Sequence, residues 1–245
     1  MASSTEQNAN RKKNESVAAK SLSEETQKSL AAVLEHLNNL QSARPTEQIS
    51  QGKPNRTKVT IDKILRAANH VFTEYGHAGL SLRKVAAKAG IAVGNLTYHF
   101  PTKDALIDAM MREALADYVE AHVAQFQANE GAPLDILLNV VEFYVRNARE
   151  SHQFFYQLWG FAGSSEDARK IVSELYRSIG RLIYYLVRAA NPKLTDSEVR
   201  LAVLQIFSLE EGYKLFIGMG PEGYPAIQSA ETDIRDLTRK IVLAA

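Results

Sequence analysis

The chain has 245 residues, with 29 Lys and Arg, 28 Asp and Glu, and no cysteine. The lack of cysteine excludes a disulfide framework, a thiolate metal site and a cysteine nucleophile. No run approaches the roughly 18 apolar residues of a membrane-spanning helix, and no apolar stretch at the N-terminus resembles a secretory signal. We therefore expect a cytoplasmic protein of one or two domains that has no part in a membrane.

Residues 1–57 are predicted to be an N-terminal extension that is disordered apart from a possible helix over residues 23–40. That helix would begin at the capping residue Ser23, and its apolar residues form one stripe. The stripe residues are Leu30, Val33, Leu34, Leu37 and Leu40. The stripe could dock on a second copy of the chain or on another protein, or the segment could be a marginal helix on a flexible tail.

Residues 58–103 are predicted to form a three-helix domain. Apolar residues three to four apart between Leu82 and Ala89 share one helix face, and Gly90 follows at the position where a left-handed residue ends a helix. A second short helix is predicted over residues 92–99. This spacing is typical of a helix-turn-helix, whose second helix enters the major groove of DNA.

Charge is strongly segregated along the chain. Residues 53–103 hold nine basic and two acidic residues, a net charge of +7, whereas residues 104–245 hold 14 basic and 20 acidic residues, a net charge of −6. A basic block that contains a groove-reading motif is the electrostatic pattern expected for phosphate binding. We therefore expect this block to face DNA and the acidic remainder to face away from it.

The second helix of the motif supplies the predicted base contacts. Asn95 could pair with adenine, Val93 and Thr97 could contact a thymine methyl group, and Gly94 would allow close approach of the backbone. Phosphate contacts are predicted for residues around this helix. The complete set of predicted DNA-binding residues is Lys58, Ser81, Arg83, Val93, Gly94, Asn95, Thr97, Tyr98, His99 and Lys103.

Residues 104–245 are predicted to form an all-α ligand-binding and dimerisation domain. Thr195 and Glu198 have the spacing of a capping box at the start of one helix. The helices are predicted over residues 103–128, 133–150, 152–162, 166–190, 195–218 and 227–244.

The last two helices are the predicted homodimer interface, because their apolar residues cover more than one packed face. Two helices from each subunit could form a four-helix interface about a two-fold axis. The residues that carry this prediction are Val199, Val203, Ile206, Phe207, Tyr213, Phe216 and Ile217.

Aromatic and histidine residues of the C-terminal domain are the predicted ligand-binding residues, in a pocket for a small, mostly apolar molecule. These are His122, Phe126, Tyr144, His152, Phe155, Tyr156, Trp159 and Tyr184. The same residues could instead be ordinary core side chains. Two histidines without a thiolate make no case for a metal, so neither a metal nor a cofactor is expected.

Residues 58–110 resemble the DNA-binding domain of the TetR family of bacterial transcriptional regulators. The resemblance rests on the run from Phe72 to Gly76, on Tyr98-His99-Phe100 and on Lys103-Asp104-Ala105-Leu106. It implies a homodimer joined by the last two helices and an effector pocket in the helices that follow the motif. Many members carry Lys and a further Tyr where this chain has Val93 and Thr97, so their operator sequences do not transfer.

The preferred hypothesis is a ligand-responsive transcriptional regulator, a repressor, that binds a palindromic double-stranded operator and is released by an unidentified small-molecule effector. One alternative is a TetR-like architectural or partner-binding protein without an effector. Another is an enzyme, but the sequence shows no nucleophile elbow, phosphate loop or paired carboxylates. We therefore expect no catalytic residues.

Overall fold

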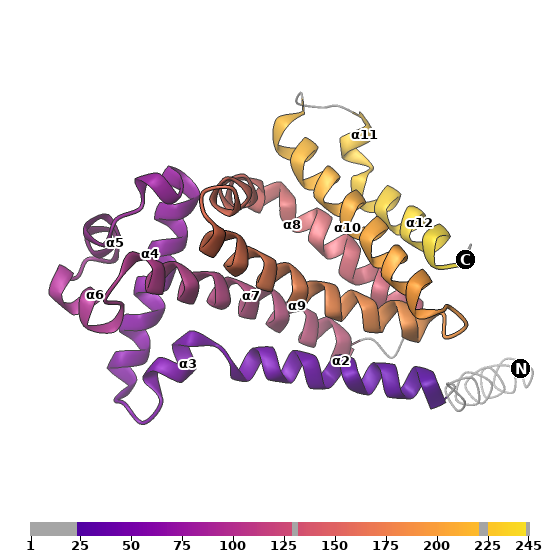
Figure 1. Ribbon diagram of the computed structural model, residues 1–245, viewed down its shortest axis with the longest axis horizontal. Helices are drawn as coiled ribbons and strands as arrows, with labels where there is room; N and C mark the ends of the chain where they lie inside the picture. The colour runs from indigo at the N-terminus through magenta and orange to yellow at the C-terminus, as the bar shows by residue number, and fades with distance from the viewer. Residues whose placement is uncertain (1–23, 129–131, 221–224, 244–245) are drawn as a thin grey trace, which may run out of the picture.

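The computed structural model describes residues 24–128, 132–220 and 225–243. All regular structure in these ranges is helical, which confirms the predicted all-α class (Figure 1). The helices are α2 (Glu24–Ser42), α3 (Pro45–Ser50), α4 (Asn55–Gly79), α5 (Leu82–Ala89), α6 (Val93–His99), α7 (Lys103–Ala128), α8 (Pro133–Ala162), α9 (Glu166–Ala190), α10 (Asp196–Met219), α11 (Pro225–Gln228) and α12 (Ala230–Leu243).

Helices α4, α5 and α6 gather at one end of the molecule, and α7 leads from them into a bundle with α8, α9, α10 and α12 (Figure 1). None of the described helices is long and apolar enough to cross a membrane. The residues that the structure describes also contain no group of three potential metal-ligating side chains. The division of the chain at residues 57 and 103 remains a prediction.

Local hydrogen bonds explain where the helices of the motif begin and end. The Ser81 hydroxyl caps α5 by accepting a bond from the Lys84 amide at 3.3 Å. Gly90 ends α5 in the left-handed region, with φ 62° and ψ 42°, as the sequence predicts. The amide of Ile91 then donates to the carbonyl oxygen of Ala86 at 3.0 Å, which closes the turn.

The helices differ from the prediction at three places. Helix α3 covers residues 45–50 of the N-terminal extension, where no helix was predicted. Helix α8 continues through the break expected between Glu150 and His152, because this segment has no Gly or Pro and its polar side chains bond back to the helix. The Ser151 hydroxyl donates to the carbonyl oxygen of Asn147 at 2.8 Å. The last long helix begins at Ala230, after the separate short helix α11.

The run from Phe72 to Gly76 joins the end of the molecule that carries α5 and α6 to the C-terminal part of α8. The Phe72 ring lies 5.7 Å from the ring of Phe154 and 6.1 Å from the ring of Phe161, measured between centroids. Gly76 has a φ of 65°, and the side-chain amide of Gln157 occupies the place that a Cβ would take. Both the backbone conformation and this close approach therefore favour glycine at this position.

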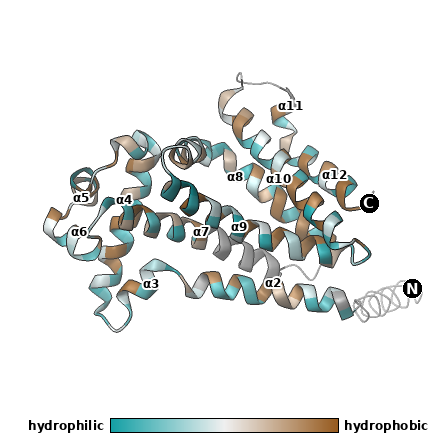
Figure 2. Ribbon diagram, viewed as in Figure 1, coloured by the Kyte–Doolittle hydropathy of each residue, from teal (hydrophilic) through white to brown (hydrophobic). Residues whose placement is uncertain are grey.

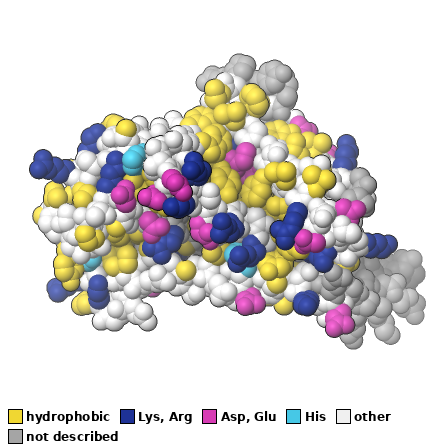
Figure 3. All heavy atoms as spheres, in the orientation of Figure 1, with side chains coloured by type: hydrophobic (Ala, Val, Ile, Leu, Met, Phe, Trp, Pro, Cys, Tyr) yellow, Lys and Arg dark blue, Asp and Glu magenta, His cyan; other side chains and the backbone are white. Residues whose placement is uncertain are grey.

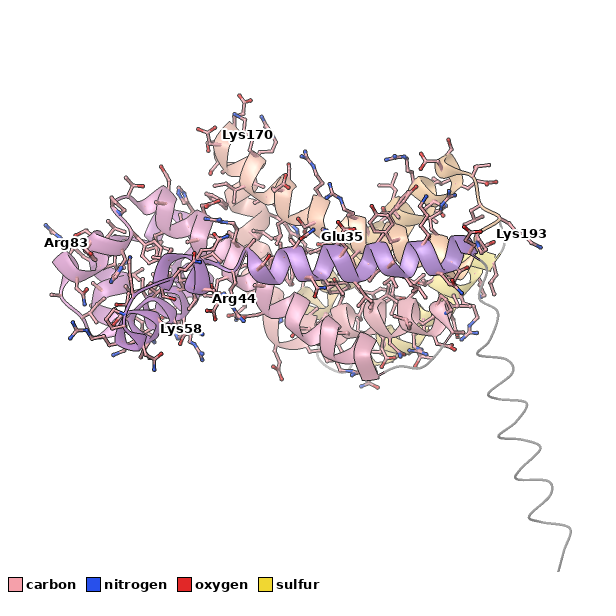
Figure 4. The ribbon with its side chains drawn as sticks, turned by 90° about the horizontal axis from the view of Figure 1, so that it is seen from below. Glu35, Arg44, Lys58, Arg83, Lys170 and Lys193 are labelled. Carbon is pink, nitrogen blue, oxygen red and sulfur yellow. The ribbon has the colours of Figure 1, made fainter. Side chains whose placement is uncertain are left out.

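Helix α2 packs on its own chain, along α9 and α7 (Figure 4). Figure 2 shows hydrophilic and hydrophobic residues alternating along it, and the side chains of Val33 and Leu37 are buried in the core of the bundle. Nε2 of His36 lies 2.8 Å from the carbonyl oxygen of Ser178 on α9. The sequence was compatible with docking of this stripe on another chain or with a marginal helix on a flexible tail. In the structure, Val33 and Leu37 of the stripe instead belong to the core of this subunit.

Candidate nucleic-acid interface and ligand site

Helix α6 is anchored by one side chain and presents the rest of its surface to solvent. Leu96 is completely buried, and Phe100, which follows the helix, is 2% exposed. Tyr98, by contrast, is 75% exposed. A helix of seven residues held at Leu96 therefore keeps an outward surface available for a partner.

The three residues predicted to contact bases lie along this short helix, together with Gly94. Val93 and Asn95 are exposed, and Gly94 has no atom within 4 Å of the position that a Cβ would take. The Thr97 hydroxyl donates to the carbonyl oxygen of Gly94 at 3.2 Å, so its polar atom is used within the helix. Among these four residues, Asn95 is therefore the one whose polar side chain is exposed and has a free amide to offer to a base.

The predicted phosphate-binding residues differ in whether their side chains already have a partner within the protein. Nζ of Lys58 pairs with Oε1 of Glu47 on α3 at 2.5 Å. Nζ of Lys103 donates to the carbonyl oxygen of His77 at 2.5 Å, which ties α7 to the last turn of α4. Arg83 projects from the end of the molecule that carries α5 and α6 (Figure 4).

His99 stands at the C-terminal end of α6, with its ring centroid 5.0 Å from that of Tyr98. Burial lowers the pKa of His99 below its ordinary value, and the nearby charge of Lys53 lowers it further. The imidazole is therefore neutral at pH 7 and can offer one donor to a phosphate oxygen.

The predicted ligand-binding residues fall into two groups. The side chains of His122 and Phe126 lie outside the described ones. Five others lie on α8, and Tyr184 lies on α9, where its hydroxyl donates to Oδ1 of Asp196 at 2.5 Å. The α8 residues are Tyr144, His152, Phe155, Tyr156 and Trp159.

Two of the α8 residues form hydrogen bonds to the neighbouring helices α10 and α9. The Tyr156 hydroxyl donates to the carbonyl oxygen of Leu215 at 2.8 Å, and the Trp159 indole donates to the Tyr176 hydroxyl at 2.9 Å. A Cβ added to Gly218 would overlap the Tyr156 hydroxyl, which shows how closely the helices approach. Tyr156 and Trp159 are nevertheless only partly buried, and the ligand-binding role of the α8 residues remains a prediction.

The structure adds a buried ionic cluster that the sequence did not reveal. Nζ of Lys214 lies 2.6 Å from Oε1 of Glu210, 2.9 Å from Oε1 of Glu211 and 4.2 Å from the centroid of the Phe155 ring. Burial opposes the charge of Lys214, but the two carboxylates outweigh burial and raise its pKa. Burial also raises the pKa of Glu210, whose Oε2 has no hydrogen-bond partner among the described residues.

In the sequence these residues resemble an ordinary exposed i, i+4 pair on a helix. One feature of the sequence could have indicated the buried cluster. Helix α10 is apolar around most of its circumference, so a charged residue on it can be buried.

Helix α10 carries an exposed apolar stripe, defined by Leu201, Leu204, Phe216 and Met219, which are 55%, 63%, 61% and 68% exposed. At about 100° per residue these positions share one face. Figure 3 shows hydrophobic side chains gathered over the region of α10. Two of the residues predicted for the dimer interface, Val199 and Ile206, are instead fully buried in the core of their own subunit.

A Gly-terminated helix followed by a short exposed helix, within a basic segment of the chain, defines a helix-turn-helix DNA-binding protein. Residues 64–110 match the family model described as "Bacterial regulatory proteins, tetR family". This match identifies residues 64–110 as a DNA-binding domain of the TetR type.

Relatives of known sequence agree with this assignment. The chain is 23% identical over 177 residues to an HTH-type transcriptional regulator in the dhlA 5' region of Xanthobacter autotrophicus, covering 71% of this chain and 87% of that protein. It is 28% identical to the repressor Rv3405c of Mycobacterium tuberculosis, covering 71% and 78%. It is 34% identical to BetI of Stenotrophomonas maltophilia, covering 34% and 43%.

Solved structures show the same fold. A transcriptional regulator from Pseudomonas aeruginosa PAO1 aligns with a TM-score of 0.63 at 20% identity, covering 79% of this chain and 96% of that one. A TetR family member from Streptomyces coelicolor aligns with a TM-score of 0.57 at 24% identity, covering 74% and 97%.

Proposed function

We propose that this TetR family regulator binds a near-palindromic operator as a homodimer, acts as a repressor, and is released by a small, mostly apolar effector. The observation that carries the proposal is the geometry of α6, which buries Leu96 and exposes Val93, Asn95 and Tyr98. A helix anchored in this way can enter a major groove without losing its packing.

The base contact is assigned to Asn95, whose amide can form two hydrogen bonds with the edge of adenine. Arg83, Tyr98 and His99 supply positioning contacts to phosphate. Lys103 has a partner in His77, but an ammonium group has three donors, so the bond to the His77 carbonyl leaves two for a phosphate oxygen.

The stripe on α10 is assigned to the homodimer, together with α12. Gly212 lies midway along this stripe with no atom within 4 Å of the position of a Cβ, so a second helix can approach closely there. A two-fold dimer places two copies of α6 about 34–36 Å apart, the length of one DNA turn. A palindromic operator follows from that symmetry.

Ligand control is proposed because α7 is shared by both parts of the molecule. It begins at Lys103, directly after the motif, and Leu106 and Ile107 in its first turns are fully buried in the core of the DNA-binding end. A ligand that favours a different tilt of α7 changes the separation of the two α6 helices. Solved relatives include a regulator from Saccharomonospora viridis in complex with choline and FadR from Bacillus subtilis in complex with stearoyl-CoA, which supports a ligand-binding role for the fold.

A selection of bound duplexes from a random pool, using the full chain, tests the proposal. We expect a sequence with two inverted half-sites about one helical turn apart. Repeating the selection with candidate effectors should lower recovery of that sequence. Recovery of unrelated duplexes with equal efficiency would overturn operator recognition and favour an architectural role.

A further inference from the structure

A cavity of about 230 Å³ lies where α2, α7 and α9 meet. Met111 and Leu115 of α7 are four residues apart and share one helix face, and Ile171 and Leu175 of α9 do the same. Leu40 of α2 contributes a fifth apolar wall. The cavity is therefore lined by three converging helix faces, one of which belongs to the N-terminal extension.

Helix α2 is fixed to the bundle on both sides of this cavity. One turn before Leu40, His36 bonds to the carbonyl oxygen of Ser178 on α9, with 2.8 Å between nitrogen and oxygen. One turn after Leu40, Nε of Arg44 lies 2.6 Å from Oε1 of Glu113 on α7. Helix α2 is therefore attached to α9 on one side of the cavity and to α7 on the other. These two attachments fix the position of the α2 wall relative to the α7 and α9 walls.

The polar groups at the cavity define the chemistry that it would accept. Asp108 and Arg112 of α7 form an ion pair at 2.8 Å, and Glu174 of α9 pairs with Arg177 at 3.1 Å. Of these four residues, Asp108, Arg112 and Glu174 line the cavity and carry a net negative charge. Ser178 adds a hydroxyl to the lining. A carboxylate ligand would be repelled, whereas a neutral hydroxyl can hydrogen-bond here.

We infer that this cavity is an effector site, and that it accepts a compact, neutral, mostly apolar molecule that carries a hydroxyl and is no larger than phenol. The inference rests on the proposed function, which it deepens by naming the site and the ligand class. Pockets for drug-sized ligands are typically about 300–1,000 Å³, and this cavity is smaller, so its occupant must be smaller than a drug. An occupant contacts Met111 and Leu115 on α7, two to three turns after the helix leaves the DNA-binding end.

Thermal unfolding of the full chain with phenol, and with benzoate as the matched anion, tests the site. Phenol should raise the unfolding midpoint of the natural chain and benzoate should not. Ala43→Leu adds a side chain to the cavity from the residue after α2, and Leu175→Trp fills it from α9. Both variants should lose the phenol-dependent shift, whereas Leu34→Trp, which enlarges a leucine on the outer side of α2, should keep it.

Ala43→Leu protects the test against simple misfolding, since filling a cavity should raise the midpoint without ligand. A phenol shift that persists in both filled variants, or no shift in the natural chain, would overturn the site. Binding of the selected operator by the same proteins reports on the proposed function separately. If the protein binds the operator but not phenol, the proposed effector site is wrong and the proposed regulatory function is unaffected. If phenol binds and leaves operator affinity unchanged, the effector role fails.

Discussion

Arg44 in the turn after α2 and Glu113 on α7 form the link between the N-terminal extension and the helix that leaves the DNA-binding motif. Nε of Arg44 lies 2.6 Å from Oε1 of Glu113, and the backbone amide of Thr46 donates to the other carboxylate oxygen at 2.9 Å. Arg44 also pairs with Asp117, one turn further along α7. Since Glu113 is 8% exposed, its carboxylate depends on these partners.

Arg44→Ala should therefore destabilise the protein by about 1–3 kcal/mol, because it leaves a largely buried carboxylate short of a partner. Urea unfolding of the full chain measures this loss. Lys170→Ala is the matched control, since Lys170 forms exposed pairs with Glu166 and Asp167. That control should change stability by no more than about 0.5 kcal/mol, and equal effects of the two variants would contradict the role of Arg44.

Docking of α2 should weaken as the pH falls. Burial lowers the pKa of His36 below its ordinary value of 6.5, the bond to the Ser178 carbonyl opposes this shift, and the charge of Arg181 adds to it. The unfolded chain therefore takes up a proton near pH 6.5 that the folded chain resists. Stability contributed by the neutral ring is present above that pH and is lost as the pH decreases below it.

His36→Gln should reduce the loss of unfolding free energy between about pH 7.5 and about pH 5.5, because glutamine does not titrate. Burial also lowers the pKa of His77 and of His99, so part of the pH dependence should remain in the variant. Identical pH profiles for the variant and the natural chain would show that His36 does not titrate in this way.

The buried pair of Glu210 and Lys214 should behave as one unit. Lys214→Met should cost about 3–5 kcal/mol, because it leaves Glu210 buried and without its cation. The double variant Glu210→Gln with Lys214→Met should be more stable than Lys214→Met alone. Urea unfolding of the two single variants and the double variant measures this coupling, and additive effects would contradict it.

The apolar stripe on α10 should control dimerisation. Leu204→Glu places a charge in the middle of the proposed interface and should convert a dimer into a monomer, which sedimentation equilibrium detects. Operator affinity should fall with it, since a monomer offers one recognition helix. Leu34→Glu changes an exposed leucine on α2, a helix that packs on α9 and α7, and should leave the mass unchanged. If the Leu204→Glu protein remained dimeric, the α10 stripe would not be the dimer interface.

Asn95 and Arg83 should differ in how they affect DNA binding. Asn95→Ala should cost about 1–3 kcal/mol at one base pair per half-site and relax specificity there. Arg83→Ala should weaken all duplexes alike and reduce the slope of log affinity against log salt by about 0.9 for each phosphate that the arginine neutralises. Lys193→Ala, at the opposite end of the molecule in Figure 4, should change neither quantity. Uniform weakening by Asn95→Ala would argue against base reading.

Some features could be predicted because they depend on a few neighbouring residues. Gly90 ends α5 since it follows the last apolar position of a helix, and it can adopt φ 62° without the penalty that other residues incur. Thr195 and Glu198 form the predicted capping box by mutual hydrogen bonds. In both places the interaction that ends or begins the helix lies within five residues of sequence.

Other features could not be predicted because they depend on which helix faces pack against one another in the tertiary structure. Val199 and Ile206 are apolar residues of α10, like Leu204, yet they face the core while Leu204 faces outward. Glu210 and Lys214 have the spacing of a surface pair, and only the packing of α8 and α9 against α10 encloses them.

The sequence by itself determined the all-α class and the helix-turn-helix, because helix caps, glycine turns and hydrophobic periodicity are local properties of the chain. Only the tertiary structure decided that α2 belongs to the subunit's own core and that α7 is held by Arg44. It also decided that a cavity remains between α2, α7 and α9. Such contacts join residues far apart in the chain, as Arg44 and Glu113 are at a separation of 69 positions, and no local hydrogen bond specifies them.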